Sequence, residues 1–195
     1  MQDGINNNAT YKFNSNNNNY TYMYYTNGQA KTTLESWYQT NIGSKADLAS
    51  KVVSGDYYCE QAKVKISDDY ESGNATMITY NKYTPDFKCS SDGNNKGVVN
   101  ASVGLLSYDE VVYAGGYRGQ SNNSYYLYNS AITWWTMSPA GIASGCSLVC
   151  SVYTTGIIGN NYVNSTNAVR PVLNLAANTQ ISSGDGTSEN PFVVE

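Results

Sequence analysis

Apolar residues are sparse over the first 19 positions and then recur at short spacings through the rest of the chain. Residues 1–19 are dominated by Asn, so we expect a flexible arm that precedes one domain spanning residues 20–195. The clearest helix signal is Ser107 followed by Glu110, a capping box that opens a helix over residues 108–114. Two earlier short helices are also predicted. Thr32 or Thr33 would cap the first, which continues through Tyr38, and Ser44 would cap the second, over residues 45–53.

Short β-favouring segments separated by turn residues fill the second half of the chain. The predicted strands cover residues 125–128, 134–137, 148–153, 162–163, 170–175, 180–181 and 192–194, with one earlier strand over residues 20–25. The predicted turns between them lie at residues 138–139, 159–161 and 184–186. These segments indicate an α+β fold with short early helices, small antiparallel sheets and long irregular loops.

The composition points to a polar but weakly charged surface. Charged residues make up 13% of the chain, and 11 Lys and Arg against 15 Asp and Glu leave a net charge of -4, without the basic stripe that nucleic-acid binding needs. Nineteen Tyr with abundant Asn and Ser are typical of antibody-like binding surfaces, where Tyr supplies contact area at low conformational cost. A Tyr-rich β-sheet domain with no binding role explains the same composition equally well.

The absence of His removes most hydrolytic chemistry. Without His, the chain cannot build Ser–His or Cys–His nucleophile pairs or His-based zinc sites. We therefore expect no enzymatic activity, no cofactor and no metal. No apolar run approaches the roughly 18 residues of a membrane-spanning helix, so we expect no direct membrane insertion and an export signal or anchor upstream of Met1.

Four Cys residues give an even number in a weakly charged chain. This pattern favours disulfides and an oxidising, extracellular or cell-surface location over metal binding in the cytosol. We expect a disulfide between Cys59 and Cys89, which would staple an irregular region over residues 57–100. We expect a second disulfide between Cys146 and Cys150.

Several motifs follow one another in a fixed order, at residues 110–116, 123–128, 135–139, 169–175, 184–187 and 190–194. This order resembles a family of surface domains of Firmicutes and other gut bacteria, of the DUF6273 type, over most of the chain. That family looks C-type-lectin-like, is related to the formylglycine-generating-enzyme type of fold, and often follows a prepilin-type anchor.

The resemblance implies a fold whose terminal strands pair and hold a loop-rich region outward as a ligand platform. Residues 20–25 would then lie beside residues 192–194. Similar folds occur in the variable proteins of diversity-generating retroelements, which display Asn, Tyr and Ser on a rigid scaffold. The corresponding stretch here lies between residues 139 and 169. The implied function is non-enzymatic recognition or adhesion, with a protein or glycan on another cell, a phage or a host surface as the partner.

Alternation of side chains places the expected binding face. Along residues 146–153, Val149 and Val152 would point inward while their neighbours face out. The residues expected to contact the ligand are Trp134, Ile142, Ser144, Cys146, Leu148, Cys150, Ser151, Tyr153, Asn160, Asn161, Tyr162 and Asn167. The alternative is that Leu148 and Cys150 form the buried face and that nothing binds there.

Two further features lie close to this expected face. Trp134 and Trp135 are adjacent in a predicted strand and would point to opposite sides, so we expect Trp135 in the core and Trp134 on the surface. Arg170 is an unusual charge in an apolar strand, and we expect it to pair with Asp109 or Glu110 as a structural anchor.

Two other functions remain open at this stage. The domain would be the outer part of a pilin-like subunit if a prepilin-type helix preceded it, with its Tyr and Asn residues serving subunit packing. The relation to the formylglycine-generating fold also raises copper-dependent oxidation at Cys146 and Cys150, although their spacing does not match that site.

Overall fold

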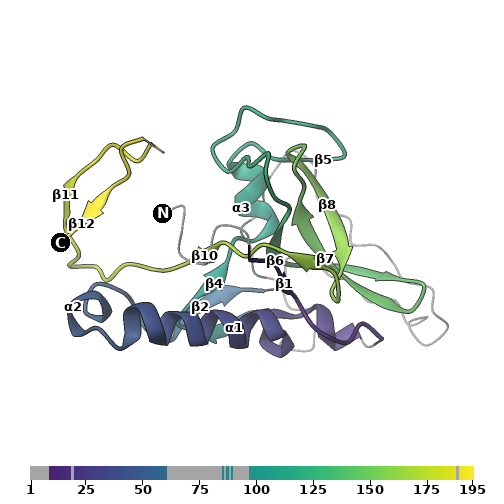
Figure 1. Cartoon of the computed structure of the whole chain (residues 1–195), viewed down its shortest axis with the longest axis horizontal. Helices are drawn as coiled ribbons and strands as arrows, with labels where there is room; N and C mark the ends of the chain where they lie inside the picture. The colour runs from purple at the N-terminus through teal and green to yellow at the C-terminus, as the bar shows by residue number, and fades with distance from the viewer. Residues whose placement is uncertain are drawn as a thin grey trace.

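A computed structural model describes most of the chain, namely residues 9–18, 20–60, 85, 87, 89, 97–187 and 189–195. The fold is α+β, with a few short helices and several small sheets, as the sequence predicts (Figure 1). No helix within these residues has both the length and the apolar character needed to cross a membrane.

Short helices dominate the first part of the chain. They are η1 (Tyr20–Met23), η2 (Tyr25–Asn27), α1 (Gln29–Tyr38), η3 (Gln39–Gly43), α2 (Ala46–Ala49) and, later, α3 (Tyr108–Tyr113). Helix α1 buries Ala30, Leu34 and Tyr38, which share one face because they are four residues apart. Both predicted early helices are present, but α1 begins before the expected Thr cap, and α2 is shorter than expected.

Helix α3 begins with the predicted capping box. The Ser107 hydroxyl accepts a hydrogen bond from the Glu110 backbone N–H at 3.3 Å, and the Glu110 carboxylate accepts one from the Ser107 backbone N–H at 2.7 Å. Val111 and Val112 are buried in the core, so the helix packs through its apolar side.

The main sheet has four strands in the order β5-β8-β7-β6. Its strands are β5 (Tyr117–Arg118), β6 (Trp134–Ala143), β7 (Cys146–Val152) and β8 (Ile157–Tyr162). Strand β7 pairs antiparallel with both β6 and β8, whereas β5 pairs parallel with β8. The β6–β7 turn uses Ser144 and Gly145, both with positive φ. Strand β7 is therefore an interior strand of the sheet.

Four two-stranded sheets complete the described fold. The pairs are β1 (Tyr11–Lys12) with β9 (Thr166–Asn167), β2 (Asp56–Cys59) with β3 (Val98–Ala101), β4 (Gly104–Leu105) with β10 (Pro171–Val172), and β11 (Ile181–Ser183) with β12 (Val193–Val194). The β11–β12 hairpin is drawn far from the main sheet in Figure 1.

The expected flexible arm is wrong for the segment around Phe13. Strand β1 pairs with β9, and Phe13 has no exposed surface. Its ring packs edge-on against Trp135, with the ring centroids 5.7 Å apart. One aromatic side chain therefore anchors a segment whose polar composition suggested a loose attachment.

The expected pairing of the two chain ends is also wrong. Residues 20–25 form the 3-10 helices η1 and the start of η2, and β12 pairs with β11 instead. Met23, Tyr24 and Tyr25 are all buried in succession. A strand with one covered face would bury only alternate residues, so three consecutive buried side chains suit a turn of helix in this position.

Two of the predicted turns lie inside strands. Residues 138–139 belong to β6, where the pairing with β7 shifts register on either side of Pro139, and residues 159–161 belong to β8. A bulge tolerates Pro within a strand, which explains why β6 continues through it. The third predicted turn is confirmed, because Gly184 and Gly186 adopt positive φ between β11 and β12.

Candidate functional site

The expected exposed face around β7 is wrong. Six of the expected contact residues have less than a tenth of their surface exposed: Trp134, Ile142, Leu148, Cys150, Ser151 and Asn167. The alternative, in which Leu148 and Cys150 point into the core, matches the structure. A ligand cannot reach these side chains without opening the main sheet.

Both faces of β7 are covered, which is why the alternation argument fails. The burial pattern of the strand is continuous from Ser147 to Val152 instead of alternating. Helix η1 packs against β6 and β7. In the segment before it, the Asn17 backbone carbonyl accepts a hydrogen bond from the Ser147 N–H at 2.7 Å. A strand buried on both faces is apolar or small at every position.

The remaining expected contact residues are half-buried or exposed. They are Ser144, Cys146, Tyr153, Asn160, Asn161 and Tyr162. Three of them are engaged within the protein. The Tyr153 hydroxyl donates to the Asn160 backbone carbonyl at 2.7 Å, and the Asn161 side-chain amide donates to the Asn167 side-chain oxygen at 3.3 Å. They divide between the β6–β7 turn and the region around β8, so they do not form the patch that the sequence suggested.

Both tryptophans of the Trp134–Trp135 pair are buried, so the expected surface position of Trp134 is wrong and the core position of Trp135 is confirmed. The Trp135 indole N–H donates to the Tyr11 backbone carbonyl at 2.8 Å. The Arg170 guanidinium lies over the Trp134 ring, 4.9 Å from the ring centroid.

Arg170 is a structural anchor, as expected, but its expected carboxylate partner is wrong. Its guanidinium donates to the Leu127 backbone carbonyl at 2.6 Å and stacks on Trp134. Burial lowers the pKa of Arg170. An aromatic face and a carbonyl oxygen therefore take the role that a carboxylate was expected to fill.

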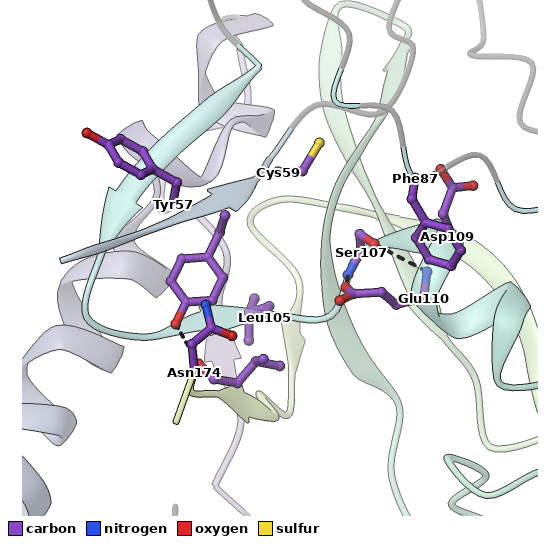
Figure 2. A pocket seen from close by; sticks show the side chains of 10 residues that line it. Tyr57, Cys59, Phe87, Leu105, Ser107, Asp109, Glu110 and Asn174 are labelled. Atoms are coloured by element: carbon purple, nitrogen blue, oxygen red, sulfur yellow. Dashed lines mark hydrogen bonds between the residues drawn. The ribbon is translucent and has the colours of Figure 1, made fainter. Parts of the chain in front are cut away.

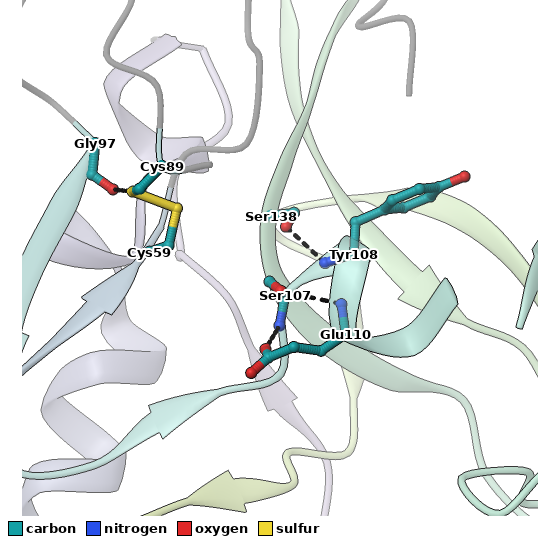
Figure 3. The surroundings of a disulfide bond; sticks show 7 residues. All are labelled: Cys59, Cys89, Gly97, Ser107, Tyr108, Glu110 and Ser138. Atoms are coloured by element: carbon teal, nitrogen blue, oxygen red, sulfur yellow. Dashed lines mark hydrogen bonds between the residues drawn. A yellow bond between two sulfur atoms is a disulfide. The ribbon is translucent and has the colours of Figure 1, made fainter. Parts of the chain in front are cut away.

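The predicted Cys59–Cys89 disulfide is present, with the α-carbons 5.5 Å apart (Figure 3). The expected Cys146–Cys150 disulfide is wrong, since neither residue forms a disulfide. Both lie on the extended strand β7, where four residues span about 13 Å, beyond the reach of a disulfide. The same separation is too great for the two thiols to share one copper ion.

A pocket of about 210 Å³ lies outside the expected face, between β2 and the first turn of α3 (Figure 2). We call it the α3 pocket. Its lining residues are Tyr57, Tyr58, Cys59, Phe87, Leu105, Ser107, Asp109, Glu110, Val172 and Asn174. Segments far apart in the sequence therefore build its walls, and the capping box forms part of one wall.

Local backbone features position the wall formed by Tyr58. A Cβ at Gly104 would lie 2.5 Å from the Tyr58 ring, so only glycine lets the ring cross this point. The Tyr58 hydroxyl donates to the Val172 backbone carbonyl at 3.3 Å. Burial, followed by the negative charge of Asp56, raises the pKa of Tyr58 to about 12. This hydroxyl therefore stays protonated throughout the physiological range.

The polar side of the pocket consists mainly of acceptors. Asp109 has 4% of its surface exposed, whereas Glu110 is exposed. Asn174 donates its amide N–H to Asp56 at 2.7 Å, which brings a third carboxylate close to the pocket. The result is a small cavity with carboxyl groups along one wall.

Large exposed aromatic side chains lie at the pocket or next to its lining. Tyr57, Phe87 and Tyr113 are 71%, 60% and 75% exposed, and we call these three residues the aromatic rim. The rings of Phe87 and Tyr113 pack edge to face with centroids 5.6 Å apart. Figure 2 shows Phe87 on the same side as Asp109, whereas the ring of Tyr57 points away from the cavity.

The sequence did not predict the α3 pocket as a site, although it predicted two structural features that lie in its walls. The capping box of Ser107 and Glu110 and the Cys59–Cys89 disulfide were both predicted, and they lie in its walls. No sequence signal brings residues near 58, 109 and 174 together, because that arrangement depends on the β2–β3 and β4–β10 pairs.

The fold and this site define a class of protein: a disulfide-stapled α+β domain with a small acidic pocket and exposed aromatic residues beside it. The chain belongs to the family described as Domain of unknown function (DUF6273), whose model matches residues 5–177. Neither a curated protein nor a solved structure shows a significant match to the chain.

The family match has two structural consequences. It includes β1 and Phe13, which agrees with their place in the core, and it ends before the β11–β12 hairpin. The disulfide is consistent with an extracellular location.

Proposed function

We propose that this domain is a non-enzymatic recognition or adhesion module at the cell surface. It binds a protein or glycan ligand through the α3 pocket and the aromatic rim. The observation that carries this proposal is the Phe87–Tyr113 pair, whose rings contact each other while most of their surface faces solvent. Aromatic side chains are enriched in the residues that dominate binding energy at interfaces, particularly beside a pocket.

The rigidity of the pocket supports the same proposal. The Cys59–Cys89 disulfide holds Cys59, which lies in the wall of the cavity, and the capping box fixes Ser107 and Glu110. Preorganised walls reduce the entropy lost on binding, so a small pocket of this kind can hold a ligand group without rearrangement.

We also propose that the fold is C-type-lectin-like and related to retroelement-diversified variable proteins, on the support of the motif order. Buried positions of β7 tolerate substitution poorly, so diversification would have to use exposed positions. Those within the stretch are Ser144, Thr154, Thr155, Tyr162, Asn164 and Thr166. We expect the neighbouring DNA to hold a reverse transcriptase gene and a repeat of this coding region that varies at these codons. A repeat that varies at the codons of β7 would contradict it.

Binding to a printed array of glycans and extracellular-matrix proteins tests the recognition function. We expect at least one class of ligand to bind the wild-type domain. Phe87→Ala and Tyr113→Ala should each weaken that binding about 10-fold, as expected at interface hot spots. Tyr126→Ala removes an aromatic residue that is 69% exposed and does not line the pocket, and it is the matched control, with no expected change.

Two results would overturn the proposal. A folded domain that binds nothing on the array would contradict a recognition function for proteins and glycans. Binding that is lost in Tyr126→Ala but kept in Phe87→Ala and Tyr113→Ala would place the ligand outside the α3 pocket.

A further inference from the structure

We infer that the α3 pocket takes a primary ammonium group on an aliphatic stem, the chemistry of a lysine side chain. This inference rests on the proposed function of the pocket as a ligand site and goes one step further, to the chemical class of the ligand. It is carried by the charge, the hydrogen-bonding groups and the size of the cavity.

The charge of the pocket favours a cation. Among the described residues that line the pocket are Asp109 and Glu110 but no Lys or Arg. Asp56 adds a third carboxylate through its hydrogen bond to Asn174. The salt bridge of the described residues joins Lys31 to Glu35, so Glu110 has no cationic partner within this part of the chain. A nearby positive charge on a ligand would therefore be favourable, and an anionic ligand would be repelled.

The hydrogen-bonding groups favour a donor ligand. The Tyr58 hydroxyl proton is directed to the Val172 carbonyl, and one of the two N–H groups of the Asn174 amide is directed to Asp56. Glu110 uses Oε2 for the capping box, which leaves Oε1 as an acceptor. An ammonium group has three donors and no acceptor, so it complements this set of groups.

The size and the apolar wall favour a single extended side chain. A volume of about 210 Å³ is smaller than the roughly 300–1,000 Å³ of pockets that hold drug-sized ligands. Leu105, Val172 and Phe87 provide apolar surface against which a methylene stem can pack. Phe87 also offers an aromatic ring to the cation, an arrangement that is attractive in a partly desolvated site.

An NMR titration of the ¹⁵N-labelled domain tests this inference with defined probes. Nα-acetyl-lysine methylamide should give saturable shifts at the amides of residues 58 and 104–110. Nα-acetyl-norleucine methylamide keeps the four-carbon stem but has no ammonium group. It should bind at least about 10-fold more weakly, because it lacks the charge-assisted hydrogen bonds. Butylamine carries the same amine and stem without peptide groups. If it binds as tightly as the lysine probe, the peptide groups of that probe contribute nothing to binding.

A charge-removing variant tests the role of Glu110 without removing the helix cap. Glu110→Gln keeps a capping side chain of the same length, so the domain should stay folded. Its Kd for the lysine probe should rise about 10-fold, and higher salt should weaken binding less than in the wild type. Asp47→Asn removes an exposed carboxylate from α2 and is the matched control, with an unchanged Kd.

The outcomes separate this inference from the proposed function. Equal binding of the lysine and norleucine probes, or an unchanged Kd in Glu110→Gln, would overturn the ammonium inference. So would the absence of shifts with every probe. In each case, array binding that still depends on Phe87 and Tyr113 would leave the recognition function intact. Array binding that does not depend on them would contradict both the ammonium inference and the proposed function of the pocket.

Discussion

Phe13 shows how a single residue determines where a polar segment lies. Its neighbours are mainly Asn and Ser, and nothing in the local pattern predicts burial. In the structure its ring fills a site between Tyr25 and Trp135. Burial of one aromatic side chain is enough to hold a short segment against the core, which is why composition alone gave the wrong result there.

Phe13→Ala should therefore destabilise the domain strongly. Removing a fully buried Phe ring leaves a cavity, and we expect a loss of about 3–5 kcal/mol in the free energy of unfolding. Urea denaturation followed by fluorescence measures the change. Phe192→Ala is the matched control, because Phe192 is 55% exposed and its truncation should have little effect. Equal effects of the two substitutions would show that Phe13 is not a core residue.

Among the elements, those set by local chemistry were predictable. The capping box needs only Ser107 and Glu110, and α3 begins where the sequence indicates. Strands β6 and β8 were less predictable, because Pro139 and the Gly159–Asn161 stretch have turn propensities that pairing with β7 overrides. The position of β7 between two covered faces also depends on elements distant in the sequence. The α3 pocket could not be predicted for the same reason.

The capping box gives a test at the level of one element. Ser107→Ala removes the hydroxyl that accepts from the Glu110 N–H, and we expect a loss of about 1 kcal/mol in the free energy of unfolding. Glu110→Gln should cost less, because Gln keeps the reciprocal hydrogen bond. Chemical denaturation of the two variants checks the order. A larger loss for Glu110→Gln would contradict the role assigned to Ser107.

At the scale of the whole molecule, the disulfide joins β2 to a distant part of the chain across 30 residues. Closing a loop of this size is expected to stabilise the folded state by roughly 3–4 kcal/mol. The double variant Cys59→Ser and Cys89→Ser should lower the urea midpoint accordingly. Cys146→Ser is the control, since Cys146 forms no disulfide. An unchanged midpoint in the double variant would show that the bridge does not contribute to stability.

Buried tyrosines should make the whole domain sensitive to alkali. Burial raises the pKa of Tyr58 and of Tyr125 to about 12, whereas an unfolded Tyr titrates near 10. Their stabilising contribution is fully present below pH 10 and is lost as the pH rises toward 12, because the unfolded state then releases protons first. The urea midpoint should fall over this interval. A midpoint that stays constant through pH 12 would contradict the burial of these hydroxyls.

Ligand contacts should gather at the α3 pocket and not on the main sheet. Hydrogen–deuterium exchange, measured with and without a ligand identified on the array, locates them. We expect the ligand to slow exchange in residues 56–59 and 104–113. Slower exchange confined to residues 144–162, with no change around α3, would contradict this expectation.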